Sequence, residues 1–193
     1  ARMSELGLVP GTLRFEEIGK ASGATPISGL LMFAPEESLF FANADTVRTQ
    51  VTNRLAEAPQ KVDGVLLDLE LTNELDVPSA DGLKELHDDL ETAGVKLRLA
   101  RVRPAVRDLM DRSGVTEAIG AENIHIRVLE GVLVHLSAKD EHVDLFLGLS
   151  ADALRFLQQA LSEMLVQATG DRRTQLEAIR IQLARAIDGT QPG

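Results

Sequence analysis

The chain has 193 residues, and its 30 aspartates and glutamates outnumber its 20 lysines and arginines, for a formal net charge of −10. This sign of charge argues against a general nucleic-acid binder and against a peripheral protein attracted to anionic lipid. The absence of cysteine excludes disulfides, zinc–thiolate sites and cysteine nucleophiles.

Hydrophobic residues make up 44% of the chain but aromatic residues only 3%, with no tryptophan or tyrosine. Leucine, valine, isoleucine and alanine must therefore build the core. No run approaches the roughly 18 apolar residues that span a bilayer, and no secretory h-region is present at the start. The chain opens on Ala1-Arg2-Met3, and we expect it to be a processed, tagged or excised piece.

The first third of the chain is expected to change from irregular to regular structure. Five glycines within residues 1–29 predict an irregular lead-in, with a short extended piece at 12–18. Apolar runs predict two short strands, at 29–33 and 38–43. Val47, Val51 and Leu55, spaced by four, predict a helix over 44–58, capped by Asn43 or Asp45 and ended by Pro59.

The middle of the chain predicts a βαβ unit. The apolar run Val62–Leu69 indicates a strand buried on both faces. Leu83, Leu86, His87 and Leu90 then recur at helical spacing, and Gly94 ends that helix. A second apolar run, Val95–Val102, indicates the next strand.

The remaining elements are expected to be mostly helical. Pro104 suits the first turn of a helix that stops at Gly114. After a turn at 120–123, residues 124–137 fit either a strand or a helix, and we favour a brief strand followed by a helix. Residues 138–141 are a polar hinge and the expected domain edge. Alternation then predicts a strand over 143–149, followed by helices over 150–168 and 172–187.

These elements predict an α/β fold: a small mixed sheet with helices mainly on one face, followed by a C-terminal helical extension. The expected division is a lead-in over 1–29, a domain over 30–137 and the extension over 138–193. The extension can pack on the domain, pair with another copy of the chain, or form a separate unit.

Catalytic and metal-binding motifs are missing from the sequence. It contains no P-loop, no G-x-G-x-x-G after a strand, no G-x-S-x-G and no H-E-x-x-H. The four histidines (87, 125, 135 and 142) do not fall at ligand spacing and are expected at the surface or half-buried. The acidic pairs 36–37 and 88–89 are interpreted as solvated faces. We therefore predict no catalytic residue, metal or cofactor, and a protein that is not an enzyme.

The loop Asp76-Val77-Pro78-Ser79 is the one stretch with unusual chemistry. It connects a strand to a helix whose N-terminus favours anions. Asp76 can accept hydrogen bonds from the first free N–H groups, and Pro78 suits the first helical position. One interpretation is a capped helix start with no further role. The other is a docking or regulatory loop, in which phosphorylation of Ser79 would place a dianion at the helix N-terminus.

The order strand, Asp-x-[Ser/Thr/Pro]-[Gly/Ser] loop, helix with L-x-x-L, glycine and strand resembles the STAS domain. That fold occurs in bacterial anti-sigma-factor antagonists and in the cytoplasmic C-terminal domain of SulP-type anion transporters. Residues 9–12, 26–33 and 39–45 are similar to the transporter branch, and residues 102–114 match the third helix of the fold. The resemblance covers about residues 9–137.

The resemblance implies a non-catalytic regulatory or docking domain on the cytoplasmic side of the inner membrane, with the membrane part of the same SulP-like transporter as partner. The antagonists carry their phosphorylated hydroxyl two residues after the aspartate, where this chain has Pro78. That difference favours a rigid docking corner. A free-standing signalling module that binds a kinase or anti-sigma partner is the alternative. Nucleotide binding is less expected, because the charge is −10 and no phosphate-gripping motif is present.

Overall fold

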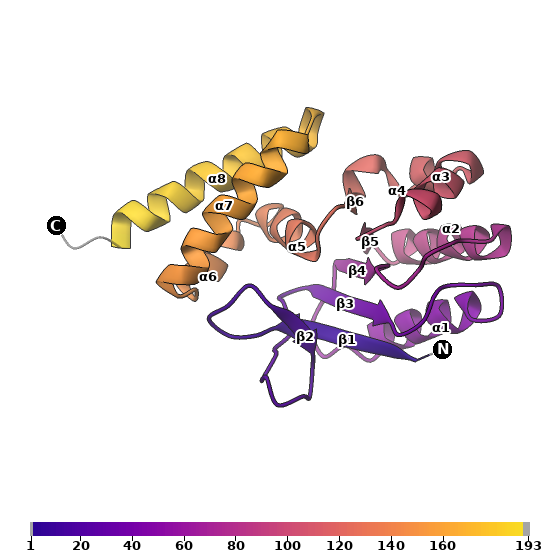
Figure 1. The fold of residues 1–193 in the computed structure, drawn as a ribbon. Helices are drawn as coiled ribbons and strands as arrows, with labels where there is room; N and C mark the ends of the chain where they lie inside the picture. Colours follow the sequence, from indigo (N-terminus) through magenta and orange to yellow (C-terminus); the bar gives the residue numbers. More distant parts are fainter. Residues whose placement is uncertain (1, 191–193) are drawn as a thin grey trace.

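A computed structural model describes residues 2–190, and a mixed β-sheet lies at its centre (Figure 1). Its strand order is β2-β1-β3-β4-β5-β6. β1 pairs antiparallel with β2 and β3, whereas β3 to β6 are parallel. The strands are β1 Met3–Leu8, β2 Phe15–Glu17, β3 Leu30–Pro35, β4 Gly64–Asp68, β5 Lys96–Ala100 and β6 Ile124–His125. The α/β prediction with a small mixed sheet is confirmed.

One face of the sheet is covered by the helices that connect its parallel strands. These are α1 Ala44–Ala56, α2 Val77–Thr92, α3 Pro104–Ser113 and α4 Val115–Ile119, the last followed by the 3-10 turn η1 Ala121–Asn123. Alternate strand residues, such as Phe33, Leu67 and Leu99, pack against Val51, Leu86 and other buried positions of these helices. The predicted βαβ unit is therefore present as β4-α2-β5.

The opposite face is covered by α5 Val128–Ser137. Its Val132 packs with Met32 and Leu66, the strand residues that point away from α1–α4. β4 is thus buried on both faces, which explains why its sequence is continuously apolar rather than alternating. The predicted order of a brief strand followed by a helix in residues 124–137 is confirmed.

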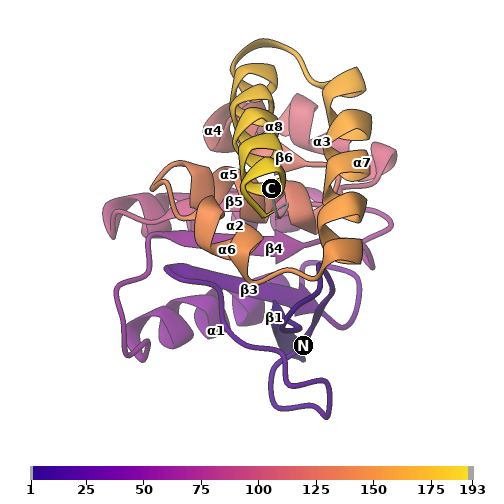
Figure 2. The same cartoon turned by 90° about the vertical axis from the view of Figure 1, so that its left-hand side faces the viewer.

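Three further helices form a separate layer beyond α5: α6 His142–Leu147, α7 Ala151–Gln167 and α8 Gly170–Thr190. They share an apolar cluster that includes Phe146, Leu161 and Ile179, and α5 contributes Leu129 and Leu133 to it. Figure 2 shows α8 running in front of α5, with α7 beside it. Within residues 2–190, no helix is long and apolar enough to cross a membrane.

Three secondary-structure predictions are wrong. The lead-in is not irregular throughout, because β1 and β2 form a hairpin on the sheet; β2 lies within the extended piece predicted at 12–18. Residues 38–43 form no strand, since the side chain of Asn43 holds them in a turn. Residues 142–147 form α6 instead of a strand, and its buried Phe146 joins the helical cluster. The domain boundaries at 29/30 and 137/138 stay a prediction.

Three of the histidines also differ from expectation, whereas His87 is half-buried as expected. His125, His135 and His142 are buried, with 1%, 5% and 3% of their surfaces exposed. Each has a polar partner: Glu130 for His125, the Ser28 carbonyl for His135 and Gln182 for His142. Such partners offset the cost of burying a polar ring. The sequence could not reveal these partners, because each histidine and its partner lie in different segments of the fold.

Candidate functional site

The Asp76–Ser79 loop forms the start of α2. Asp76 is the N-cap in extended geometry, and its Oδ1 accepts a hydrogen bond of 2.8 Å from the Ser79 N–H. The predicted capping role of Asp76 is thus confirmed. Pro78 occupies the second helical position rather than the first, because α2 begins at Val77. Proline is tolerated in this first turn, where its missing N–H would have no intrahelical acceptor.

Asp76 also holds the loop that precedes α1. Its Oδ2 accepts a hydrogen bond of 2.9 Å from the N–H of Phe41. Asn43 shapes the same loop, accepting from the Phe40 N–H and donating to the Ser38 carbonyl, each at 2.9 Å. The Ser79 side chain, followed by the Ser79 and Phe41 N–H donors, lowers the pKa of Asp76. The carboxylate therefore fixes two loops relative to each other.

Large apolar side chains are exposed around this carboxylate. Phe41, Leu71 and Val77 have 70%, 50% and 59% of their surfaces exposed, and Phe40 has 41%. The two phenylalanine rings meet edge to face, with centroids 5.9 Å apart. The loop of Leu71 is joined to the same group, because the Leu39 N–H donates to Thr72 Oγ1 at 3.2 Å. We call Phe40, Phe41, Leu71 and Val77 around Asp76 the apolar corner.

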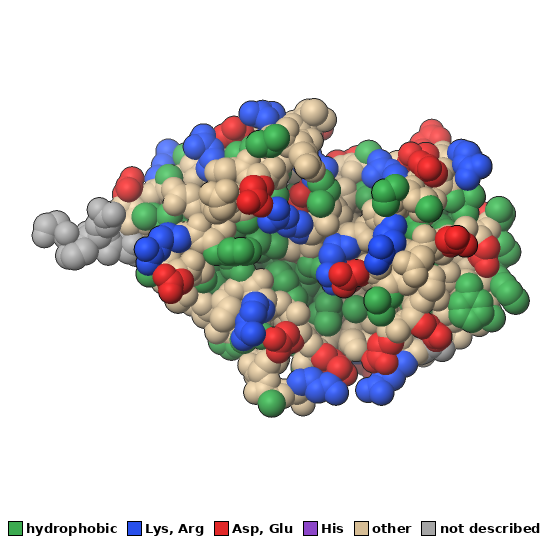
Figure 3. All heavy atoms as spheres, in the orientation of Figure 1, with side chains coloured by type: hydrophobic (Ala, Val, Ile, Leu, Met, Phe, Trp, Pro, Cys, Tyr) green, Lys and Arg blue, Asp and Glu red, His purple; other side chains and the backbone are tan. Residues whose placement is uncertain are grey.

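The apolar corner lies at the end of the molecule where α1 and α2 begin. Figure 3 shows hydrophobic side chains gathered at the right-hand end of the molecule, which is this end in the orientation of Figure 1. Exposed apolar groups of this kind mark interaction surfaces more often than single scattered residues do. The sequence predicted the Asp76 loop but missed the phenylalanines as part of the site, because they were assigned to a short strand.

Ser79 is fully buried, and its hydroxyl oxygen lies beside the Asp76 carboxylate. A kinase cannot reach this oxygen unless the first turn of α2 opens. Val77 and Pro78 are exposed instead. The assignment of Ser79 as a phosphoacceptor stays a prediction. It requires that the first turn of α2 unfold locally before a kinase can act.

Replacing Asp76 with alanine is expected to lower the free energy of unfolding by about 1 kcal/mol near neutral pH, the usual cost of a lost N-cap. Because the pKa of Asp76 is lowered in the folded chain, its contribution is complete above the unfolded pKa of about 3.9. It is lost as the pH falls through the folded pKa. Urea unfolding should therefore show a difference between the two proteins that shrinks in acid.

The control for this prediction is Asp81→Ala. Asp81 lies in the same helix, but it makes only an exposed ion pair with Lys84, at 2.9 Å. Such pairs contribute about 0.5 kcal/mol or less. An Asp76→Ala protein that loses no more stability than Asp81→Ala would show that the capping assignment is incorrect.

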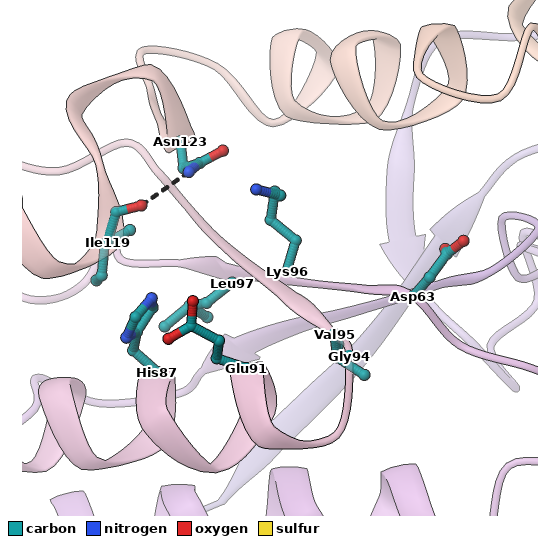
Figure 4. Close-up of a pocket in the computed structure, with 9 residues that line it drawn as sticks. All are labelled: Asp63, His87, Glu91, Gly94, Val95, Lys96, Leu97, Ile119 and Asn123. Carbon is teal, nitrogen blue, oxygen red and sulfur yellow. Dashed lines mark hydrogen bonds between the residues drawn. The ribbon is translucent and has the colours of Figure 1, made fainter.

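A pocket of about 240 Å³ lies between the end of α2 and the start of β5 (Figure 4). His87 and Glu91, one helical turn apart, both project from α2 beside it. Together with Asp88 they place possible ligand atoms within 4.8 Å of one another. The i, i+4 spacing of His87 and Glu91 is visible in the sequence, but only spacings between histidines entered the prediction. Exposed groups on one helix turn do not by themselves define a metal site, and we assign none.

A buried charged cluster lies on the α5 side of the sheet, and no sequence pattern indicated it. Arg98 of β5 is 6% exposed and donates to Asn123 Oδ1 at 3.0 Å. His125 of β6 lies 3.5 Å from Arg98 and 3.1 Å from the carboxylate of Glu130. Arg172 of α8 pairs with that same carboxylate. The cluster thus runs from the sheet, through α5, to the last helix.

Burial and pairing shift the pKa values in this cluster. Burial lowers the pKa of Arg98 to about 10 and also lowers the pKa of His125. His125 is therefore neutral at pH 7. Burial opposes the ionisation of Glu130, but hydrogen bonds from His125 and Arg172 outweigh it and lower the pKa of this carboxyl. Glu130 is accordingly a buried carboxylate held in its charged form.

Comparison with known proteins agrees with this architecture. The family model of the STAS domain matches residues 24–130. The chain belongs to the STAS domain family. Solved structures agree on the fold: SLC26A9 has a TM-score of 0.64 at 20% identity, over 76% of this chain and 26% of that one. The STAS domain of a SulP transporter from Vibrio cholerae has a TM-score of 0.52 at 18% identity, over 61% and 88%.

Curated relatives of this STAS domain are named as transporters. A probable sulfate transporter of Mycobacterium tuberculosis is 28% identical over 121 residues, covering 63% of this chain and 22% of the relative. Probable sulfate transporter 3.4 of Arabidopsis thaliana is 25% identical over 137 residues, covering 67% and 21%. The chain thus spans about a fifth of the length of the curated relatives it matches.

Proposed function

We propose that this STAS domain is the non-catalytic, cytoplasmic regulatory domain of a SulP-like anion transporter. It acts by docking onto the membrane domain of the same transporter. The relatives named as sulfate transporters support the assignment to this kind of protein. By analogy with the names of these relatives, we propose sulfate as the transported anion.

The observation that carries the docking role is the apolar corner. Its exposed side chains are held on short loops that Asp76 and Asn43 tie together. Rigid loops lose little conformational freedom on binding, so more of the contact energy remains as affinity. Val77 and Pro78 provide the exposed part of the predicted docking loop. The hydrogen bond from the Ser79 N–H to the Asp76 carboxylate fixes the conformation of this loop.

The charge around the corner indicates the kind of partner. Glu74 is exposed in the loop that carries Leu71, as is Glu70, whose carboxylate pairs with Arg101 at 2.7 Å. The chain as a whole has a net charge of −10. An acidic rim is repelled by anionic lipid head groups. It is attracted to the cytoplasmic loops of membrane proteins, which carry an excess of lysine and arginine. We therefore propose these basic loops as the surface that the corner contacts.

Membrane association of the native protein tests the assignment itself. Host membranes are washed with alkaline carbonate, and the native protein is detected with an antibody raised against this domain. We expect it in the pellet, at a mass several times that of this chain. Recovery only as a small polypeptide in the supernatant would end the proposal.

The double variant Phe41→Ser, Val77→Ser tests the docking surface. In the full-length transporter we expect uptake of labelled sulfate to fall several-fold, because two exposed anchors of the corner are lost. Stability should change little, since both side chains already face solvent. Phe156→Ser is the matched control, because Phe156 is 57% exposed on α7, away from the corner. Equal uptake by the two variants would refute the role of the corner.

A further inference from the structure

The C-terminal helices are joined to the rest of the protein by a buried ion pair. Glu130 of α5 has a fully buried side chain, and the side chain of Arg172 is 18% exposed. Arg172 Nη2 donates to Glu130 Oε2 at 2.6 Å, and its Nε contacts the other carboxylate oxygen. Arg172 lies in the first turn of α8, outside the residues that match the STAS family model.

Besides this ion pair, the helices contact the domain through the exposed Arg127–Glu163 pair, the Ser150 N–H donating to the Gly11 carbonyl, and Leu145 of α6, which packs against the core under α5. Their apolar cluster reaches the domain through Leu129 and Leu133 of α5, with Leu13 and Phe15 of the first hairpin at its edge. The core between the sheet and α1–α4 contains no residue of α6, α7 or α8. The α6–α8 layer can therefore separate without opening that core.

The segment that connects α5 to α6 has the features of a hinge. Residues 138–140 are exposed, and Asp140 has a left-handed backbone with φ of 56°. A non-glycine residue in this region stores a small amount of strain.

We propose that residues 142–190 form a releasable cover over α5, and that the Glu130–Arg172 ion pair is the latch that holds the cover closed. In the open state both charges return to water. The pair therefore matters only while the cover is closed, where each charge compensates the burial of the other. Loss of Glu130 leaves the Arg172 guanidinium without its countercharge in the closed state, and loss of Arg172 leaves the buried Glu130 carboxylate with the His125 ring but no countercharge.

Opening would uncover a defined surface on α5. Leu129 and Leu133 would be exposed beside the Glu130 carboxylate, a strip that fits an amphipathic helix carrying a basic residue. The present occupant, α8, has this chemistry, with Arg172 beside Leu176 and Ile179. The cover is thus a self-occupied docking site, and this inference does not rest on the proposed transporter function.

Hydrogen–deuterium exchange on the whole chain tests the latch with Glu130→Gln, Arg172→Gln and the double variant. In each single variant we expect exchange in α7 and α8 to accelerate by about 100-fold or more, since an unpaired buried charge disfavours the closed state. Arg172→Gln should act more strongly, because Glu130 is the more deeply buried partner. Exchange in α2 and β4 should stay at the rate of the parent protein.

The double variant distinguishes a latch from general damage. With both charges removed, two neutral amides face each other, and we expect the exchange of α7 and α8 to return to within about 10-fold of the parent rate. Glu163→Gln is the matched control, because Glu163 forms an exposed ion pair with Arg127 between α7 and α5, and it should leave exchange unchanged. Faster exchange that includes α2 and β4, or a double variant as open as the single ones, would overturn the proposal.

Discussion

Replacing Arg101 with alanine is expected to lower the free energy of unfolding by about 3 kcal/mol. Arg101 follows β5, and its Nε donates to Asp68 Oδ1 at 2.9 Å, while its Nη2 contacts the other carboxylate oxygen. Asp68 is 4% exposed at the end of β4. Without the guanidinium, this carboxylate would stay buried without a countercharge. Urea unfolding at neutral pH measures the difference.

Arg107→Ala is the control for Arg101. Arg107 also pairs with an aspartate at 2.9 Å, but its partner, Asp111, is half exposed one helical turn away. Exposed pairs of this kind contribute about 0.5 kcal/mol. Arg101→Gly adds a second test, because Arg101 has φ of 56° and glycine removes that strain. Arg101→Gly should therefore lose less free energy of unfolding than Arg101→Ala. The prediction is contradicted if Arg101→Ala loses no more than Arg107→Ala.

Replacing Gly131 with alanine is expected to destabilise the protein by about 2 kcal/mol, although alanine is the better helix former. Gly131 lies in α5 on the side of the helix that faces Leu66 and His125 of the sheet. A Cβ at this position would collide with Leu66 Cδ1 and lie 3.2 Å from the His125 ring. Both neighbours are buried between α5 and the strands, so α5 must shift outward. Thermal and urea unfolding both report the loss.

Gly189→Ala is the matched control. Gly189 also lies in a helix, α8, but a Cβ there would meet no atom within 4 Å. We expect it to be neutral or to stabilise by a few tenths of a kcal/mol. If Gly131→Ala behaves in the same way, α5 does not depend on close approach to the sheet.

The parts of the fold that could be predicted from the sequence are those where burial and local geometry agree. In the segment from β4 to β5, a continuous apolar run, a capping aspartate and leucines at helical spacing all indicate the same βαβ unit. The Asp76 cap was found for the same reason, because an N-cap acts on donors only three residues away. Ser150 caps α7 in the same way, accepting from the Ala153 N–H at 3.1 Å, at the residue where the sequence predicts this helix to start.

The predictions failed where a distant contact decides the structure. Phe40 and Phe41 have the composition of a strand, but Asn43 and Asp76 hold them in an exposed turn. The hairpin of β1 and β2 forms because β3 provides an edge for it, and the local glycine content gave no sign of this. The pairing of Glu130 with Arg172 joins residues 42 positions apart. No local periodicity reports such a pair.

The first and last segments of this chain meet, and this affects the order in which the protein can fold during synthesis. The Ser150 N–H donates to the Gly11 carbonyl at 3.2 Å, and Leu13 and Phe15 touch the apolar cluster of α6–α8. The loop around Gly11 leaves the ribosome before its partners in α6–α8. Closing so long a loop is entropically slow. The sheet with α1–α4 can therefore form while α6–α8 are still being synthesised, and the docking of these helices follows.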